Sequence, residues 1–357
     1  MAVPGYLSAA GKSFFIAAPP GHNFRLYFDG WTPDWKVISE GKSQVLERLV
    51  ALDKHVLGTL QALRARQVAM ADSQKDLIRE AVASAPFTTG LGIEHPLENG
   101  FAFLDPYGLP YLPGSGVKGV VRRAAEELAL FERDPKGWSI PAVWWLFGFD
   151  ANSAFFAHGG DTVPKVVADE MHEWKEAYQR HLGKLNSDGQ QLFTSFCTAV
   201  ASAAYSEEVI RHALRGDGKQ EAIHHVHLRG ALEFWDVIPE PAHGKLRVDI
   251  MNPHYNHYYQ KGQPPGDWGN PVPIDFLTLP PGSKFTFIVR FRPPNHWPPE
   301  VRQVLEPQWM KLVSAALEFA WDWQGFGAKT AVGYGRMGSV SKKPLPTVQA
   351  PKGPGGV

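Results

Sequence analysis

Near the end of the chain lies the stretch Gly325-Phe-Gly-Ala-Lys-Thr-Ala-Val-Gly-Tyr-Gly-Arg336, which joins a long amphipathic helix to the last predicted strand. Its four glycines permit positive φ angles and remove side chains, so backbone N–H groups could face a phosphate while Lys329 and Arg336 supply positive charge. Phe326 and Tyr334 belong to the residue types that stack on nucleobases. Glycine is also the usual residue at the end of a helix, so an ordinary helix stop is equally compatible with this stretch.

A second glycine-containing segment, Pro110-Tyr-Leu-Pro-Gly-Ser-Gly-Val-Lys-Gly119, leads into an amphipathic pattern that continues to Phe131. We expect Ser115 to cap the helix and the first-turn N–H groups to face an anion. Lys118 and Arg122 are four residues apart and therefore share one helical face. Phosphate is the expected ligand, although neither glycine segment has the spacing of a nucleotide-hydrolase P-loop.

Periodicity predicts an α+β chain. Residues 43–80 have a helical pattern, residues 150–223 are mostly helical in character, and Asn23–Phe28 is the only strand-like piece before residue 43. The remaining predicted elements are a strand at 81–87, a helix from about 118, strands at 226–237, 245–251, 273–279 and 284–292, a helix at 298–323 and a strand at 334–341.

Without insertions, this order is strand, helix, strand, strand, helix, strand, as in ferredoxin-like and RRM-type folds, whose sheet commonly presents an RNA-binding surface. We therefore expect an N-terminal arm and helical extension at 1–80 and a ferredoxin-like domain at 81–341. Insertions are expected at about 150–223 and 253–276, the second as a projecting β-hairpin. Residues 342–357 are rich in Pro, Gly and Lys and are expected to form a disordered tail.

The chain has 36 basic and 36 acidic residues, which argues against a free-standing nucleic-acid binder that relies on overall charge. Binding would have to use a local surface. A single cysteine, Cys197, excludes an intramolecular disulfide, and no stretch reaches the roughly 18 apolar residues of a membrane span. A cytoplasmic location without membrane contact is expected.

The motif Pro113-Gly-Ser-Gly-Val-Lys-Gly-Val-Val-Arg122 resembles the loop–helix motif of the RAMP superfamily of CRISPR proteins, and residues 325–336 resemble the C-terminal glycine-rich loop of that superfamily. Residues 89–100, and residues 249–259 together with 271–276, are similar to the sixth-subunit family of the type III-B (Cmr) effector complex. The matches follow the family order over about residues 81–340.

This resemblance implies a non-catalytic, RNA-binding structural subunit that caps the filament near the 3′ part of the CRISPR RNA (crRNA). Its implied partners are the crRNA, the target RNA and other Cmr RAMP subunits, including the backbone and the adjacent capping subunit; no cofactor is implied. The expected RNA-binding residues are Gly114, Ser115, Gly116, Lys118, Arg122, Arg123, His254, Tyr255, His257, Tyr258, Gly325, Phe326, Gly327, Lys329, Gly333, Tyr334, Gly335 and Arg336.

The aromatic residues at 254–259 suit either of two partners. In the related family such hairpins wedge between guide and target strands, whereas tyrosines are also enriched at protein interfaces. Both alternatives place this segment at a contact.

Histidines and acidic residues raise the possibility of catalysis. Glu94, His95 and Glu98 follow the first predicted strand, where the RNA-cleaving backbone RAMP subunits carry an aspartate that is missing here. A metal-free endoribonuclease with His95 or His22 as general base is the main alternative function. The third is a protein–protein adaptor without RNA contact. A metal site at His224, His225 and His227 is disfavoured because no acidic or cysteine partner has a fixed spacing to them.

Overall fold

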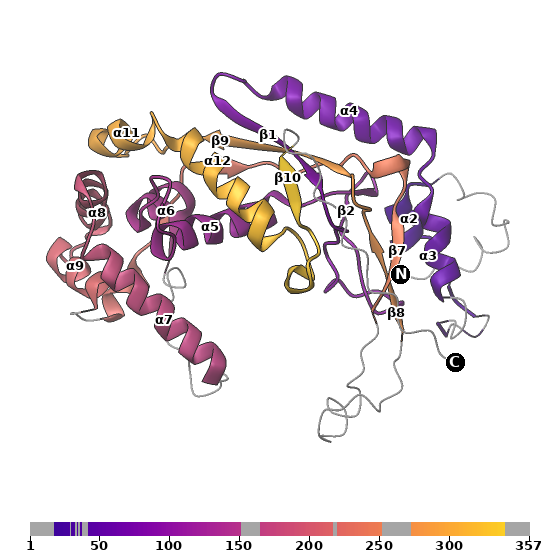
Figure 1. Ribbon diagram of the computed structural model, residues 1–357, viewed down its shortest axis with the longest axis horizontal. Helices are drawn as coiled ribbons and strands as arrows, with labels where there is room; N and C mark the ends of the chain where they lie inside the picture. Colours follow the sequence, from indigo (N-terminus) through magenta and orange to yellow (C-terminus); the bar gives the residue numbers. More distant parts are fainter. Residues whose placement is uncertain are drawn as a thin grey trace.

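The computed structural model of the chain describes residues 18–28, 30–32, 34, 36–37, 42–150, 165–216, 220–251 and 273–339. Helices and strands are mixed throughout these ranges, which confirms the α+β class (Figure 1). The expected tail at 342–357 lies outside the described residues. Within the described ranges, no helix combines the length and the apolar character that crossing a membrane requires.

A four-stranded antiparallel sheet forms the centre of the molecule. Its strands are β1 (Asp76–Ala83), β6 (Leu232–Phe234), β9 (Lys284–Phe291) and β10 (Met337–Ser339), in the spatial order β10-β1-β9-β6. Ile78 lies opposite Ile288 in the long β1–β9 pairing. The first strand had been expected at 81–87; it begins five residues earlier because the preceding helix ends at Met70 and not at residue 80.

Two helices, α5 (Gly114–Leu130) and α12 (Trp309–Phe319), lie against each other on one side of this sheet (Figure 1). The side chains of β9 explain this packing. Phe285, Phe287 and Val289 occupy every second position of the strand, so they lie on one face of the sheet, and all three are buried. Phe287 contacts Trp321 at the end of the α12 segment, with ring centroids 5.7 Å apart. This face of the sheet is the main core.

The other face of the sheet is partly covered by the N-terminal extension. Arg290 is three residues after Phe287 on β9, so its side chain points to the opposite face of the sheet. Its guanidinium reaches the Met70 carbonyl oxygen at 3.4 Å, which places the end of α4 (Lys54–Met70) on this opposite face. Arg64 of α4 pairs with Glu240 at 2.6 Å. Figure 1 shows α4 along the top of β1 and β9. The sheet surface that an open RRM-type domain would present is therefore not fully exposed.

The extension differs in detail from the sequence expectation. The predicted helix at 43–80 is two helices, α3 (Lys42–Val50) and α4, and the side chain of Asp53 caps α4 by accepting from the Val56 N–H at 2.8 Å. The predicted strand at Asn23–Phe28 is wrong, because Asn23 lies in helix α2 (Pro20–Arg25). Phe24 and Phe28 are both buried, and their four-residue spacing suits a helical turn better than a strand.

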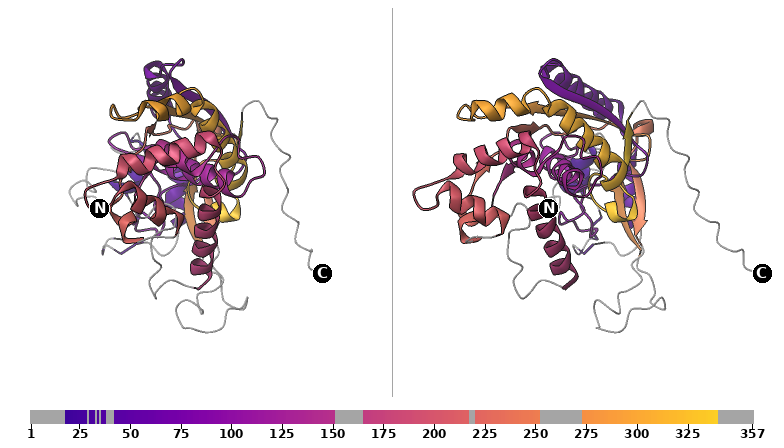
Figure 2. Two further views of the ribbon diagram at one scale, coloured as in Figure 1. Left: turned by 90° about the vertical axis from the view of Figure 1, so that its left-hand side faces the viewer. Right: turned by 60° about the vertical axis from the view of Figure 1, so that its left-hand side comes forward.

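Further helices form one end of the molecule (Figure 2). They are α6 (Ile140–Phe147), α7 (Lys165–Leu182), α8 (Ser187–Val200), α9 (Glu207–Arg215) and α11 (Pro299–Leu305), with the 3-10 turn η3 (Gln220–His225). Their shared core contains Trp144, Trp145 and Phe196. The helical character expected for 150–223 is therefore found in the described part of that range, and a two-residue ladder of β4 (Gly148–Phe149) with β5 (Leu228–Arg229) closes the region.

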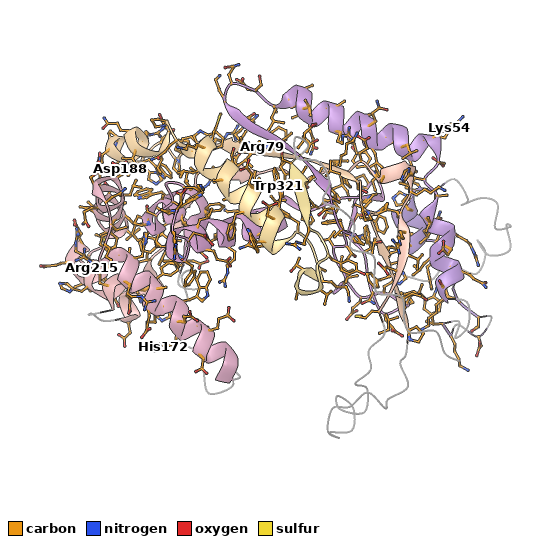
Figure 3. All side chains as sticks on the ribbon, viewed as in Figure 1. Lys54, Arg79, His172, Asp188, Arg215 and Trp321 are labelled. Atoms are coloured by element: carbon orange, nitrogen blue, oxygen red, sulfur yellow. The ribbon has the colours of Figure 1, made fainter. Side chains whose placement is uncertain are left out.

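A hairpin projects at the other end of the molecule. Its strands β7 (Arg247–Met251) and β8 (Ile274–Thr278) pair in antiparallel register, and the residues between them lie outside the described ranges. The remaining elements are the pair β2 (Phe103–Leu104) and β3 (Leu109–Pro110), and the short turns η4 (Ala242–Gly244), η5 (Ala320–Gln324, a π-helical turn) and η6 (Thr330–Val332). Figure 3 places the side chains on this framework.

Candidate nucleic-acid interface

Helix α5 begins before the expected start at about residue 118, and its first N–H is already bound. The helix starts at Gly114 with Pro113 as N-cap, so Ser115 is not the cap that the sequence predicted. The Gly114 N–H donates to Asp236 Oδ1 at 2.7 Å. A Cβ at Gly114 would lie 2.3 Å from the Phe234 carbonyl oxygen, so glycine is required here by close packing against the chain after β6. Asp236 thus occupies a donor that we expected to face a phosphate.

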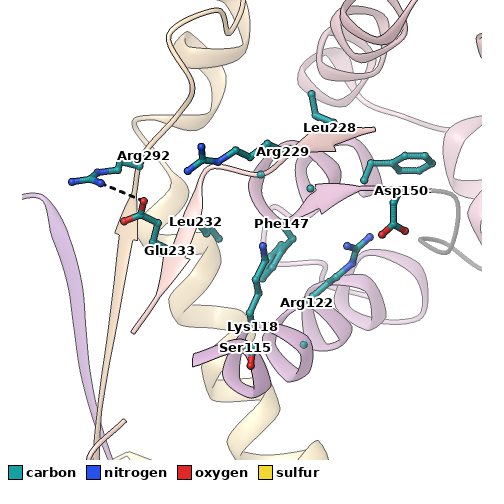
Figure 4. A pocket seen from close by; sticks show the side chains of 14 residues that line it. Ser115, Lys118, Arg122, Phe147, Asp150, Leu228, Arg229, Leu232, Glu233 and Arg292 are labelled. Atoms are coloured by element: carbon teal, nitrogen blue, oxygen red, sulfur yellow. Dashed lines mark hydrogen bonds and ion pairs between the residues drawn. The ribbon is translucent and has the colours of Figure 1, made fainter. Parts of the chain in front are cut away.

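A hollow of about 570 Å³ lies beside the first turns of α5 (Figure 4). It opens between α5 and the β4–β5 ladder, and Figure 4 shows Lys118 and Arg122 extending from α5 toward that ladder. Ser115 and Gly119 are exposed on its α5 side. The residues that line it are Ser115, Lys118, Gly119, Arg122, Phe147, Gly148, Phe149, Asp150, Leu228, Arg229, Gly230, Leu232, Glu233 and Arg292.

Positive charge dominates the polar lining of the hollow. Burial lowers the pKa of Lys118, and the nearby guanidinium groups of Arg122 and Arg229 lower it further. Arg122 pairs with Glu126 at 3.0 Å and Arg292 with Glu233 at 3.5 Å. Within the described part of the chain, neither Lys118 nor Arg229 forms an ion pair. Two cations at this hollow therefore lack a counter-ion among the described residues.

Two other predicted residues of α5 do not line the hollow. The guanidinium of Arg123 lies 3.4 Å from the centre of the Trp174 ring and pairs with Glu127 at 2.9 Å, so Arg123 joins α5 to α7. Gly116 is exposed, and a Cβ there would make only ordinary contact with Leu112. Nothing in the packing of the helix requires glycine at this position.

The glycine-rich loop after η5 folds back on itself. The Phe326 N–H donates to the Gly335 carbonyl oxygen at 2.9 Å, and a Cβ at Gly335 would lie 1.9 Å from the Phe326 carbonyl oxygen. The Phe326 ring is fully buried against Phe287, with ring centroids 5.2 Å apart. Phe326 is therefore a core residue in this structure, and the expectation that its ring stacks on a base is wrong for this conformation.

Most of the loop's other glycines also serve close backbone packing. Gly325 and Gly327 both have positive φ, and a Cβ at Gly327 would lie 2.1 Å from the Thr88 carbonyl oxygen. At Gly333, φ is also positive, but a Cβ would meet no other atom within 4 Å. Arg336 is exposed and donates to the Asp322 carbonyl oxygen at 2.6 Å. Gly333 and Arg336 are thus the predicted loop residues that open most directly to solvent.

Lys329 and Tyr334 connect the loop to the projecting hairpin. The Tyr334 hydroxyl donates to Asp249 Oδ2 at 2.8 Å, and burial, reinforced by this carboxylate, raises the pKa of Tyr334 to about 12. Lys329 Nζ lies 3.0 Å from the Met251 sulfur and 5.3 Å from the centre of the Phe276 ring. Both side chains contact protein in this structure.

The structure therefore separates the predicted site into two regions. Lys118, Arg122 and Ser115 line the hollow, whereas residues 325–336 do not. His254, Tyr255, His257 and Tyr258 lie outside the described residues.

The candidate general bases are held by backbone contacts. His95 Nδ1 accepts from the Leu97 N–H at 3.1 Å, so Nε2 carries the proton that bonds the Phe24 carbonyl oxygen at 2.8 Å. Burial lowers the pKa of His95, and its ring stacks on Phe24 at 3.7 Å. His22 Nε2 is 2.7 Å from the Pro106 carbonyl oxygen. His95 has no free ring nitrogen with which to accept a proton from a substrate.

Three residues at this interface were not singled out from the sequence: Arg229, Arg292 and Asp236. In Arg229-Gly230 a cation is followed by a glycine, a local pattern that could have indicated close approach of a phosphate. Asp236 and Arg292 carry no local signal, since their roles depend on chain segments brought together only by folding. Among the described side chains, no three His, Cys, Asp or Glu residues are grouped as a metal site would need.

The family model described as the RAMP superfamily matches residues 81–338. The CRISPR system Cmr subunit Cmr6 of Pyrococcus furiosus is 31% identical over 258 residues, which cover 70% of this chain and 63% of that protein. The chain thus spans less than two thirds of the length of this relative.

Two solved structures also match. The crystal structure of Cmr6 from Pyrococcus furiosus has 27% sequence identity and a TM-score of 0.31, with 74% of this chain and 97% of that chain covered. A cryo-EM structure of the type III-B Cmr-beta complex bound to cognate target RNA has 16% identity and a TM-score of 0.41, with 93% and 88% covered.

Proposed function

Because the chain belongs to the RAMP superfamily, we propose that it is an RNA-binding structural subunit of a type III-B CRISPR effector complex. The relative that supports the complex type is named as a Cmr subunit. In this role the chain contacts the 3′ part of the crRNA and its duplex with target RNA, and it caps the filament beside other RAMP subunits. Its expected location is the cytoplasm.

The observation that carries the RNA-binding proposal is the pair of cations at the hollow, Lys118 and Arg229, that have no protein counter-ion among the described residues. Lys118 belongs to the loop–helix motif that resembles the RAMP superfamily. A chain with no net charge requires such a local concentration of positive charge to bind RNA.

The order of the sheet supports a ferredoxin-like assignment for the domain. In the order β10-β1-β9-β6, the first and third strands are central, and the helices that follow them, α5 and α12, lie on one side. We propose that α3 and α4 are an N-terminal extension of this domain, and that α7–α9 and the β7–β8 hairpin are insertions into it.

A non-catalytic role is favoured over the endoribonuclease alternative by the state of His95. Both of its ring nitrogens are committed to backbone groups. A general base needs a free acceptor near the attacking hydroxyl, which this residue lacks.

The test is a charge reversal in the assembled complex. The chain is co-expressed with its genomic neighbours, and the purified complex is analysed for bound RNA and for protein content. The double variant Lys118→Glu/Arg122→Glu should retain the partner subunits but hold less guide RNA. The matched control, Lys54→Glu/Arg66→Glu, reverses two exposed cations on α4, away from the hollow.

Other outcomes identify the alternatives. An unchanged RNA content in the α5 variant would contradict RNA contact at this helix. Partner subunits without RNA in the wild-type preparation would indicate an adaptor. Cleavage of naked precursor RNA by the chain alone would indicate an endoribonuclease.

A further inference from the structure

We infer that the hollow beside α5 binds a phosphate of the RNA backbone, and that Arg229, together with Lys118 and Arg122, holds it. This inference rests on the proposed function, and it adds to it a specific site and a residue outside the loop–helix motif. The ligand class is a phosphodiester, bound without regard to base sequence.

The position of Arg229 is fixed by tight packing of β5. Arg229 pairs with Gly148 in the two-residue β4–β5 ladder. A Cβ at Gly148 would lie 2.9 Å from the Leu228 carbonyl oxygen, and a Cβ at Gly230 would lie 2.3 Å from the Phe147 carbonyl carbon. The two glycines therefore allow β4 and β5 to approach closely, so the backbone that carries Arg229 is held in place before any ligand binds. With the backbone fixed, only the side chain has to be ordered when a ligand binds.

Arg122 adds positive charge to the lining of the same hollow. Its Nε bonds Glu126 Oε1 at 3.0 Å, whereas its Nη2 is buried with no hydrogen-bond partner among the described residues. This buried nitrogen is not exposed to a ligand in the hollow, so Arg122 contributes through its charge. The charges of Lys118 and Arg229, which have no counter-ion among the described residues, favour an anion.

The lining has more cationic than acidic residues: Lys118, Arg122, Arg229 and Arg292 against Asp150 and Glu233. Glu233 is paired with Arg292 at 3.5 Å, and Figure 4 shows Asp150, the residue after β4, on the side of Arg122. Lys118 is close enough to Arg122 and Arg229 for both to disfavour its charged form. A bound phosphate would relieve this repulsion among like charges.

The shape of the hollow favours a nucleic-acid backbone over a base. The rings of Phe147 and Phe149 are 2% and 4% exposed, so neither offers a face for stacking. Gly119 and Gly230 line the hollow without side chains, which permits close approach of a sugar–phosphate chain. At the helix tip, Asp236 already accepts from the Gly114 N–H, so its carboxylate repels phosphate there and favours binding beside the helix.

The test measures binding of short single-stranded RNA to the full-length chain by fluorescence anisotropy at several salt concentrations. Two RNAs of equal length are used, one of uridine only and one of mixed sequence. Arg229→Ala should weaken binding of both by more than about tenfold, the effect of one charged hydrogen bond. It should also reduce the slope of log affinity against log salt by about 0.7, the value for one phosphate contact of a single strand.

The controls separate charge from structure. Arg229→Lys keeps the charge and should preserve most of the salt slope, whereas Arg66→Ala removes an exposed cation from α4 and should change neither quantity. Arg229 is exposed and has no ion pair among the described residues, so Arg229→Ala should melt at the wild-type temperature.

Each outcome supports or overturns the inference. Equal RNA binding by wild type and Arg229→Ala would overturn the site, whereas the proposed function is tested separately by the RNA content of the purified complex. Absence of RNA binding by the wild-type chain would also overturn the site. If polyglutamate displaced the RNA equally well from Arg229→Ala and from Arg66→Ala, that result would indicate a general surface for acidic ligands and would contradict binding at this hollow. A loss of affinity for only one of the two RNAs would contradict backbone recognition.

Discussion

Asp236 accepts a hydrogen bond from the backbone N–H of Gly114 at 2.7 Å, so a carboxylate caps α5 from a segment 122 residues away in sequence. The backbone carbonyl of the same aspartate accepts from Gln67 Nε2 of α4 at 2.8 Å. One residue therefore joins the two sides of the sheet, because α4 and α5 lie on opposite faces. The start of the helix that lines the hollow is held by this connection.

Replacing Asp236 should destabilise the fold. Asp236→Ala removes the cap and should lower the free energy of unfolding by about 1 kcal/mol, with a smaller loss for Asp236→Asn, which keeps an acceptor oxygen. Urea denaturation measures the difference. Asp169→Ala, an exposed aspartate on α7, is the control and should have almost no effect. Equal stabilities for Asp236→Ala and Asp169→Ala would show that the cap contributes nothing.

Two glycines of the loop should respond very differently to alanine. Gly335→Ala places a methyl group 1.9 Å from the Phe326 carbonyl oxygen at positive φ, so the loop must move and stability should fall by more than about 2 kcal/mol. Gly333→Ala has positive φ but open space and should lose only about 1 kcal/mol. Thermal or urea unfolding of both variants is the measurement. A Gly335→Ala protein as stable as Gly333→Ala would refute the role of close packing.

The phenol of Tyr334 should titrate at lower pH when Asp249 is neutralised. Asp249 accepts the phenolic proton and repels the phenolate, so Asp249→Asn should lower the pKa of Tyr334 from about 12. Burial remains, and the pKa should stay above the ordinary value of about 10. The difference in ultraviolet absorbance between each protein and its Tyr334→Phe counterpart isolates this tyrosine. An unchanged or raised pKa would mean that the Tyr334–Asp249 bond does not form.

The buried His95 should make stability depend on pH. Burial lowers its folded-state pKa below the ordinary value of about 6.5, so between these two values the unfolded chain binds more protons than the folded chain. The free energy of unfolding should therefore fall as the pH is lowered through about 6.5 toward the folded-state pKa. Urea denaturation over this range should show a shallower decline for His95→Gln than for wild type.

His181, whose pKa is also lowered by burial, should account for part of the decline that His95→Gln retains. His55→Gln, an exposed position on α4, is the control and should reproduce the wild-type profile. A pH profile of His95→Gln that equals the wild-type profile would show that His95 is not buried as described.

Removing Arg229 should raise the pKa of Lys118. Burial is the larger cause of the lowered pKa, and the charge of Arg229 is a smaller one, so Arg229→Ala should bring a partial return toward the ordinary value. The pKa is measured by NMR of reductively methylated lysines, with the Lys118→Arg variant to assign the signal. Arg66→Ala should leave the pKa unchanged, and no rise in Arg229→Ala would place Arg229 too far from Lys118 to share a ligand.

Local sequence was sufficient to predict several parts of this protein. The alternating apolar residues of β9 and the amphipathic pattern after Pro113 predict a strand and a helix because each depends only on near neighbours in the chain. The glycines at 325–335 correctly indicate a turn after α12, since positive φ is a local property of those residues. Boundaries were less accurate, and the N-terminal strand at 23–28 was wrong because burial of Phe24 and Phe28 suits a helix.

By contrast, whether residues of these elements are buried, paired or free to bind a ligand depends on residues distant in sequence. Whether Phe326 is exposed or buried depends on Phe287, and whether the tip of α5 can meet an anion depends on Asp236. The positive hollow requires Arg229 to be placed beside Lys118 by the β4–β5 ladder. Backbone propensity and periodicity are short-range and are encoded locally, whereas charge neutralisation and burial depend on which distant groups folding brings together.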